Sequence, residues 1–143
     1  MSKIILAVDF GERRMGLAVS DPSYIIARPY CTLDTLKDKN PIEAIKRIVK
    51  KEDVGLIIVG YPYHTNGSIS EKARVVDDFI KKLKTKLSRI PIKRTDERYS
   101  SVEAKEILGK KKGKKISDKK AIDRIAAAVF LQDYLNEHQG IKL

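Results

Sequence analysis

The chain has 143 residues, 42% of them hydrophobic, and a net charge of +11, which predicts one globular domain, residues 1–143, with a core of its own. No apolar stretch reaches the roughly 20 residues of a membrane helix, the run KIILAV is too short for a secretory signal, and the single cysteine, Cys31, excludes an internal disulfide. We therefore expect a cytoplasmic protein. Its charge favours an anionic partner such as nucleic acid, although lysine enrichment also accompanies heat adaptation.

The first third of the chain predicts three strands. Apolar runs at residues 3–9 and 15–20 are separated by a short loop with a glycine, as in a hairpin. A further extended segment is predicted at residues 25–33, where Pro29 suits an edge strand.

Strands and helices alternate in the remainder, which indicates a mixed α/β domain. Asn40 as N-cap and Pro41 in the first turn predict the start of a helix. The continuous apolar run at residues 54–60 is typical of a strand covered on both faces. The later elements expected are a helix after a capping box at Ser68 and Glu71, a strand at 90–96, a helix after a second capping box at Ser100 and Glu103, and a last helix from about 118 to 138.

Three acidic residues stand where an unpaired carboxylate is costly. Asp9 ends an apolar strand, Glu97 follows the strand at 90–96, and Asp123 shares a helix side with the core-type residues Ala126 and Ala127. Because strand ends in an open α/β sheet are where ligand sites form, we expect the three to converge.

Each acid also has a structural alternative. Asp9 could cap a turn through downstream amides. The other two could form ion pairs with nearby basic residues, namely Arg94 or Arg98 for Glu97, and Lys119 or Lys120 for Asp123.

Three convergent carboxylates without a cysteine or histidine pattern favour Mg²⁺ or Mn²⁺ over zinc. In two-metal sites such ions clamp the attacking and leaving oxygens of a phosphoryl displacement, and basic residues around the site hold the nucleic-acid backbone. The lysine-rich segment at residues 105–120 is either a mobile basic loop that clamps the backbone or a solvated run of charge. Together these features predict a nuclease.

Four segments, DFGERRMGLAVSD, VGYP with a following NG, DERYSSVEA and IDRIAAAVFLQDYL, resemble the YqgF-type nuclease family, in family order and over nearly the whole chain. That family is described as a Holliday junction resolvase and as the nuclease that matures the precursor of 16S rRNA. The resemblance implies a ribonuclease H-like α/β fold, with a mixed five-stranded sheet that is flanked by helices and has its first three strands antiparallel.

The resemblance further implies that Asp9, Glu97 and Asp123 are metal-binding catalytic acids and that Arg14 contacts phosphate. The lysines expected to hold the nucleic-acid backbone are Lys110, Lys111, Lys112, Lys114 and Lys115. Further positions match the family motifs without an assigned role, namely Asp21, Asp96 and Arg98. Two tyrosines replace the usual aliphatic residues and put local substrate contacts in doubt, namely Tyr61 and Tyr99.

The activity expected is hydrolysis that leaves a 5′-phosphate and a 3′-hydroxyl, with the 5′ end of pre-16S rRNA, alone or in a pre-ribosomal particle, favoured as substrate. The alternatives are a Holliday junction resolvase, which would normally work as a dimer, and a ribosome-assembly factor that binds nucleic acid with weak or vestigial cleavage. A sugar-kinase-like ATPase would need two such domains. The sequence leaves the choice between monomer and homodimer open.

Overall fold

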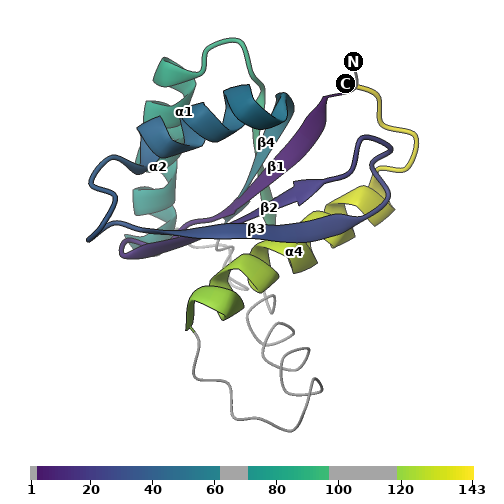
Figure 1. Cartoon of the computed structure of the whole chain (residues 1–143). Helices are drawn as coiled ribbons and strands as arrows, with labels where there is room; N and C mark the ends of the chain where they lie inside the picture. The colour runs from purple at the N-terminus through teal and green to yellow at the C-terminus, as the bar shows by residue number, and fades with distance from the viewer. Residues whose placement is uncertain (1–2, 62–70, 97–118) are drawn as a thin grey trace, which may run out of the picture.

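The computed structural model describes residues 3–61, 71–96 and 119–143 (Figure 1). The elements along the chain are β1 (Ile4–Asp9), β2 (Arg14–Ser20), β3 (Ala27–Asp34), α1 (Pro41–Glu52), β4 (Val54–Tyr61), α2 (Glu71–Lys86), β5 (Ile92–Asp96) and α4 (Lys119–Glu137). The predicted helix after Ser100 and Glu103 lies outside the described residues, and so does Ser68 of the first capping box.

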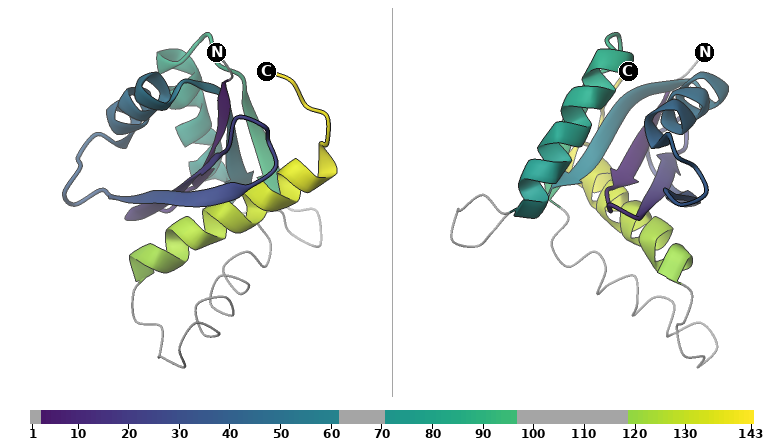
Figure 2. Two further views of the ribbon diagram at one scale, coloured as in Figure 1. Left: turned by 45° about the vertical axis from the view of Figure 1, so that its right-hand side comes forward. Right: turned by 90° about the vertical axis from the view of Figure 1, so that its left-hand side faces the viewer.

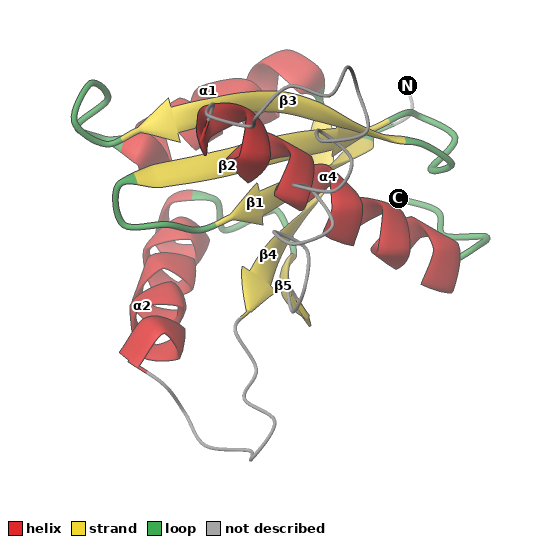
Figure 3. Ribbon diagram, turned by 90° about the horizontal axis from the view of Figure 1, so that it is seen from below, coloured by secondary structure: helices red, strands yellow, loops and turns green. Residues whose placement is uncertain are grey.

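The strands form one mixed five-stranded sheet in the order β3-β2-β1-β4-β5 (Figure 3). β2 is antiparallel to both β1 and β3, whereas β4 is parallel to both β1 and β5. The predicted hairpin and the predicted edge strand are therefore confirmed. Exposed Pro29 lies opposite Ala18, beside an irregularity in the β2–β3 ladder.

Helices cover both faces of the sheet, α1 and α2 on one and α4 on the other (Figure 2). The side chains of β1 alternate between these layers, with Leu6 and Val8 in the α1/α2 core and Ile5 and Ala7 in the α4 core. The inner residues of β4 are buried on both sides, as the continuous apolar run predicts.

The predicted start of α1 is confirmed, because the Asn40 side chain accepts a hydrogen bond from the backbone N–H of Glu43 at 3.2 Å. The helix is capped by Asp53, which adopts a left-handed backbone conformation with φ of 55°. This cap turns the chain directly into β4, whose first residue pairs with Ile4 at the start of β1.

Candidate active site

Three strands that carry or directly precede predicted site residues end or begin at one edge of the sheet. The parallel strands β1 and β5 end there, at Asp9 and Asp96, and the antiparallel strand β2 begins there with Arg14. Parallel strands that end at one sheet edge are where α/β proteins bind ligands.

Asp9 falls on the face of the sheet that α4 covers, because it continues the alternation of Ile5 and Ala7. In the β1–β2 ladder it lies directly opposite Gly16. Its side chain is half-buried. Asp9 therefore stands beside the strand on which the first turns of α4 rest.

Gly16 lies very close to the backbone of α4. A Cβ atom at this position would lie 1.9 Å from the carbonyl oxygen of Asp123 and 2.7 Å from the backbone nitrogen of Arg124. Only a residue without a Cβ allows the two backbones to come so near. Since Gly16 is the ladder partner of Asp9, Asp9 and the part of α4 that carries Asp123 lie at the same edge and on the same face of the sheet.

Small and polar side chains dock the start of α4. Ala126 and Ala127 are fully buried, which confirms that the alanine-rich helix lies close to the sheet. On the edge strand β3, Thr32 lies opposite Gly16, and its hydroxyl donates a hydrogen bond to the carbonyl oxygen of Lys120 at 2.5 Å. The sequence did not reveal this role of Thr32, because its hydrogen-bond partner, Lys120, lies 88 residues later in the chain.

The side chain of Asp123 accepts a hydrogen bond from Arg14, with 2.8 Å between Nε and Oδ2. The two side chains are 24% and 28% exposed. The sequence also allows an ion pair of Asp123 with Lys119 or Lys120, but the Lys120 ammonium lies 3.7 Å from the carboxylate of Asp34 instead. The cation beside Asp123 is thus the arginine that was predicted to contact phosphate.

Several predicted residues lie outside the described part of the chain. They are Glu97, Arg98, Tyr99 and the lysines Lys110, Lys111, Lys112, Lys114 and Lys115. Arg94, one of the alternative partners of Glu97, binds Asp77 of α2 through Nη2 at 2.6 Å.

Tyr61 has a structural role that the sequence did not reveal. Its hydroxyl donates a hydrogen bond to Asp77 at 2.9 Å, and the Arg94 guanidinium lies 5.3 Å from the centre of its ring. Burial raises the pKa of Asp77, but the hydrogen bonds from Arg94 and Tyr61 outweigh this effect and lower it overall. The tyrosine that departs from the family pattern thus ties β4 and β5 to α2.

Asp21 lies at the other end of β2 and takes no part in the edge site. Its carboxylate accepts hydrogen bonds from the backbone N–H groups of Ser23, Ile25 and Ile26 at 3.2, 2.7 and 2.8 Å. Burial raises the pKa of Asp21, and these hydrogen bonds lower it by more, so that its pKa lies below the ordinary value. The carboxylate stabilises the connection to β3, in which Tyr24 has a φ of 60°.

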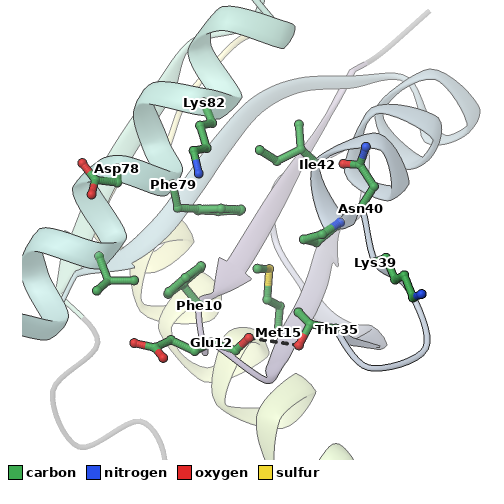
Figure 4. Close-up of a pocket in the computed structure, with 12 residues that line it drawn as sticks. Phe10, Glu12, Met15, Thr35, Lys39, Asn40, Ile42, Asp78, Phe79 and Lys82 are labelled. Atoms are coloured by element: carbon green, nitrogen blue, oxygen red, sulfur yellow. Dashed lines mark hydrogen bonds between the residues drawn. The ribbon is translucent and has the colours of Figure 1, made fainter.

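A cavity of about 530 Å³ lies on the opposite face of the sheet, between β1, α2 and the start of α1 (Figure 4). Apolar residues and lysines line it, among them Phe10, Met15, Phe79, Lys39 and Lys82. The Phe10 and Phe79 rings contact each other, with centroids 4.7 Å apart. Among the described residues, Asp9, Arg14 and Asp123 do not line this cavity.

Known proteins resemble this chain in sequence and in fold. The sequence model of RuvX, a family described as Holliday junction resolvase, matches residues 3–137. The chain belongs to the RuvX family. A protein of Thermoanaerobacter pseudethanolicus, named "Putative pre-16S rRNA nuclease", is 37% identical over 95% of this chain and 98% of its own length. A protein of the same name from Chloroflexus aurantiacus is 39% identical over 96% of this chain and 90% of its own.

Solved structures share the fold of this RuvX-family chain. RuvC of T. thermophilus in complex with a Holliday junction substrate has a TM-score of 0.59 at 16% identity, with 96% of each chain covered. The Fowlpox virus resolvase in complex with Holliday junction DNA also has a TM-score of 0.59, at 14% identity, with 94% of this chain and 97% of that chain covered. The expected ribonuclease H-like fold is confirmed. In the described part of the chain, no helix is long and apolar enough to cross a membrane.

Proposed function

We propose that this chain is a metal-dependent nuclease with Asp9, Glu97 and Asp123 as its catalytic carboxylates. One observation carries the assignment. Asp9 lies opposite Gly16 in the sheet, and Gly16 contacts the backbone of Asp123, so two of the three acids stand at one edge and on one face. Membership of a family of nucleases supports the same reaction class.

The residues at this edge fit a hard divalent cation. Asp9 and Asp123 offer the carboxylate oxygens that Mg²⁺ and Mn²⁺ prefer, and Asp123 already binds a cationic group, the guanidinium of Arg14. Within residues 3–61, 71–96 and 119–143, no three His, Cys, Asp or Glu side chains form a metal-binding group. We therefore propose Glu97, the residue that follows β5, as the third metal-binding carboxylate.

Each residue has a distinct task in the proposed reaction. When bound, Mg²⁺ or Mn²⁺ activates the attacking water and stabilises the charge on the phosphate. Asp9, Glu97 and Asp123 hold the cations, and Arg14 binds a phosphate oxygen of the substrate. The lysines between residues 110 and 115 bind the nucleic-acid backbone at positions other than the cleaved bond. The products carry a 5′-phosphate and a 3′-hydroxyl.

We infer that the favoured substrate is the precursor of 16S rRNA, because relatives that match over nearly the full length of both chains bear that name. A four-way DNA junction is the second candidate. It is supported by the description of the family and by a fold shared with RuvC and the Fowlpox virus resolvase. Both substrates are cleaved at a phosphodiester bond, so the acids serve either one.

The test compares cleavage of an rRNA-precursor fragment and of a four-way DNA junction, each with Mg²⁺ and with a chelator. We expect Asp9→Asn to lose cleavage by about 10²-fold to 10³-fold while it still binds nucleic acid, since it removes charge stabilisation of several kcal/mol. The matched control is Glu12→Gln, which neutralises an exposed carboxylate three residues away. A fully active Asp9→Asn protein refutes the assignment. Retained binding without metal-dependent cleavage by the wild type would instead favour an assembly factor.

A further inference from the structure

We propose that Arg14 is an internal counter-ion of the metal site, which holds the Asp123 carboxylate and competes with the divalent cation for it. This inference rests on the proposed function, because it concerns the same carboxylates. It adds to the role of Arg14 as a phosphate contact, and it predicts that metal and nucleic acid bind cooperatively.

The backbone segments that carry this pair are closely packed. Arg14 lies opposite Asp34 in the β2–β3 ladder, and a Cβ on Gly11 would lie 2.3 Å from the carbonyl oxygen of Arg14, so the turn before β2 is tight. On the other side, the Asp123 backbone rests on Gly16. The ion pair is thus made between two backbone segments that lie in close contact.

The position of Arg14 on β2 explains why it reaches Asp123. Arg14 and Gly16 are two residues apart in one strand and therefore point to the same face. Gly16 lets the helix approach, and Arg14 then meets the carboxylate at 2.8 Å. This contact is a charge-assisted hydrogen bond at a partly buried position, where it is stronger than a fully exposed pair.

Asp9 and Asp123 place negative charge on one face at one edge, and such a pair needs a cation nearby. In the absence of metal, the guanidinium supplies positive charge at Asp123. A divalent cation must displace or share that contact. An arginine freed in this way can bind a phosphate oxygen, and a phosphate that draws the arginine away leaves Asp123 to the metal. Each ligand therefore raises the affinity of the other by the same factor.

The experiment titrates Mn²⁺ into the full chain, with and without a nucleic-acid strand that resists cleavage, and measures metal binding directly. Without nucleic acid, we expect Arg14→Gln to bind Mn²⁺ about two- to tenfold more tightly than the wild type, because a competing cation is removed. With nucleic acid, the wild type should gain affinity for Mn²⁺, and Arg14→Gln should gain less.

Two further variants serve as controls for Arg14→Gln. Arg13→Gln removes the same charge from the exposed neighbouring residue and should change Mn²⁺ affinity much less than Arg14→Gln. Arg14→Lys keeps a competing cation and should stay near the wild type. Thermal unfolding checks that each variant is folded.

The possible failures are distinguishable. Unchanged or weaker Mn²⁺ binding by Arg14→Gln overturns the counter-ion role, while metal-dependent cleavage by the wild type would leave the proposed function standing. An equal gain in Arg13→Gln also overturns it, since the effect would then be one of net charge. If the wild type binds no Mn²⁺, or if Asp9→Asn binds it equally well, the metal site itself is wrong and the proposed function fails with it.

Discussion

Replacing Gly16 by alanine tests the contact on which the candidate site depends. The new Cβ would lie 1.9 Å from the carbonyl oxygen of Asp123, whereas ordinary contacts begin at 3.4 Å. The start of α4 must therefore move by about 1.5 Å, because both partners are backbone and neither can rotate away. Overpacking of this kind costs roughly 1–3 kcal/mol, and we expect the upper end here. A loss of about 3 kcal/mol lowers the melting temperature of a chain of this size by roughly 6–12 °C.

The same shift should also impair catalysis. A displacement of about 1 Å in a catalytic group can cost roughly 10²-fold in rate, and Asp123 moves with the helix, whereas Asp9 is held on β1 by its pairing with β2. The assay is metal-dependent cleavage at a temperature where denaturation curves show that Gly16→Ala is still folded.

Two controls separate the site from general stability. At Gly55, near the start of β4 and away from the Asp9 end of β1, an added Cβ would lie 2.8 Å from the Cβ of Lys3, so Gly55→Ala should also cost stability but should keep cleavage while it is folded. Leu135→Ala, three turns farther along α4, removes a side chain that is 2% exposed and should cost roughly 2–5 kcal/mol without a loss of cleavage while folded. Wild-type stability and activity in Gly16→Ala would refute the close approach.

Two further predictions concern residues away from the predicted acids. Asp21→Ala should destabilise the protein by about 1–2 kcal/mol at neutral pH, since three backbone N–H groups lose their acceptor. The pKa of Asp21 is lower in the folded state. The stability that its carboxylate contributes is therefore present above its unfolded pKa and lost as pH falls through its folded pKa. The difference in unfolding free energy between the wild type and Asp21→Ala should accordingly disappear in acid and persist in alkali. Tyr61→Phe should cost about 0.5–1.5 kcal/mol through loss of the hydrogen bond to Asp77; unaltered urea unfolding would show that the bond contributes nothing.

The elements that the sequence predicted well are those whose signals are local. The hairpin follows from two apolar runs with a short loop between them, and the start of α1 follows from Asn40 and Pro41. The expectation that Asp9 and Asp123 lie at one edge of the sheet rests on a general property of α/β sheets, the use of strand ends as sites.

The partner of Asp123 was not predictable in the same way. Lys119 and Lys120 lie within one turn of it in the chain, and local reasoning therefore favours them. The position of α4 over the sheet decides otherwise, since it sets Asp123 beside Arg14, 109 residues earlier. Tyr61 illustrates the same limit. Its hydrogen bond to Asp77 and its contact with Arg94 depend on how α2 packs on β4 and β5.

Substitutions at Gly16 and Arg14 change two properties of the site separately, the distance between Asp9 and Asp123 and the charge beside Asp123. Gly16→Ala should move the Asp123 backbone and leave every charge in place, whereas Arg14→Gln changes the charge and leaves the backbone contact intact. If the ion pair depends on the close approach, Gly16→Ala already breaks it, and the double variant should bind Mn²⁺ no more tightly than Gly16→Ala alone. Independent roles would instead give additive free energies of Mn²⁺ binding. The same titration, run on the four proteins of this cycle, therefore shows whether β2 controls the site through one contact or through two.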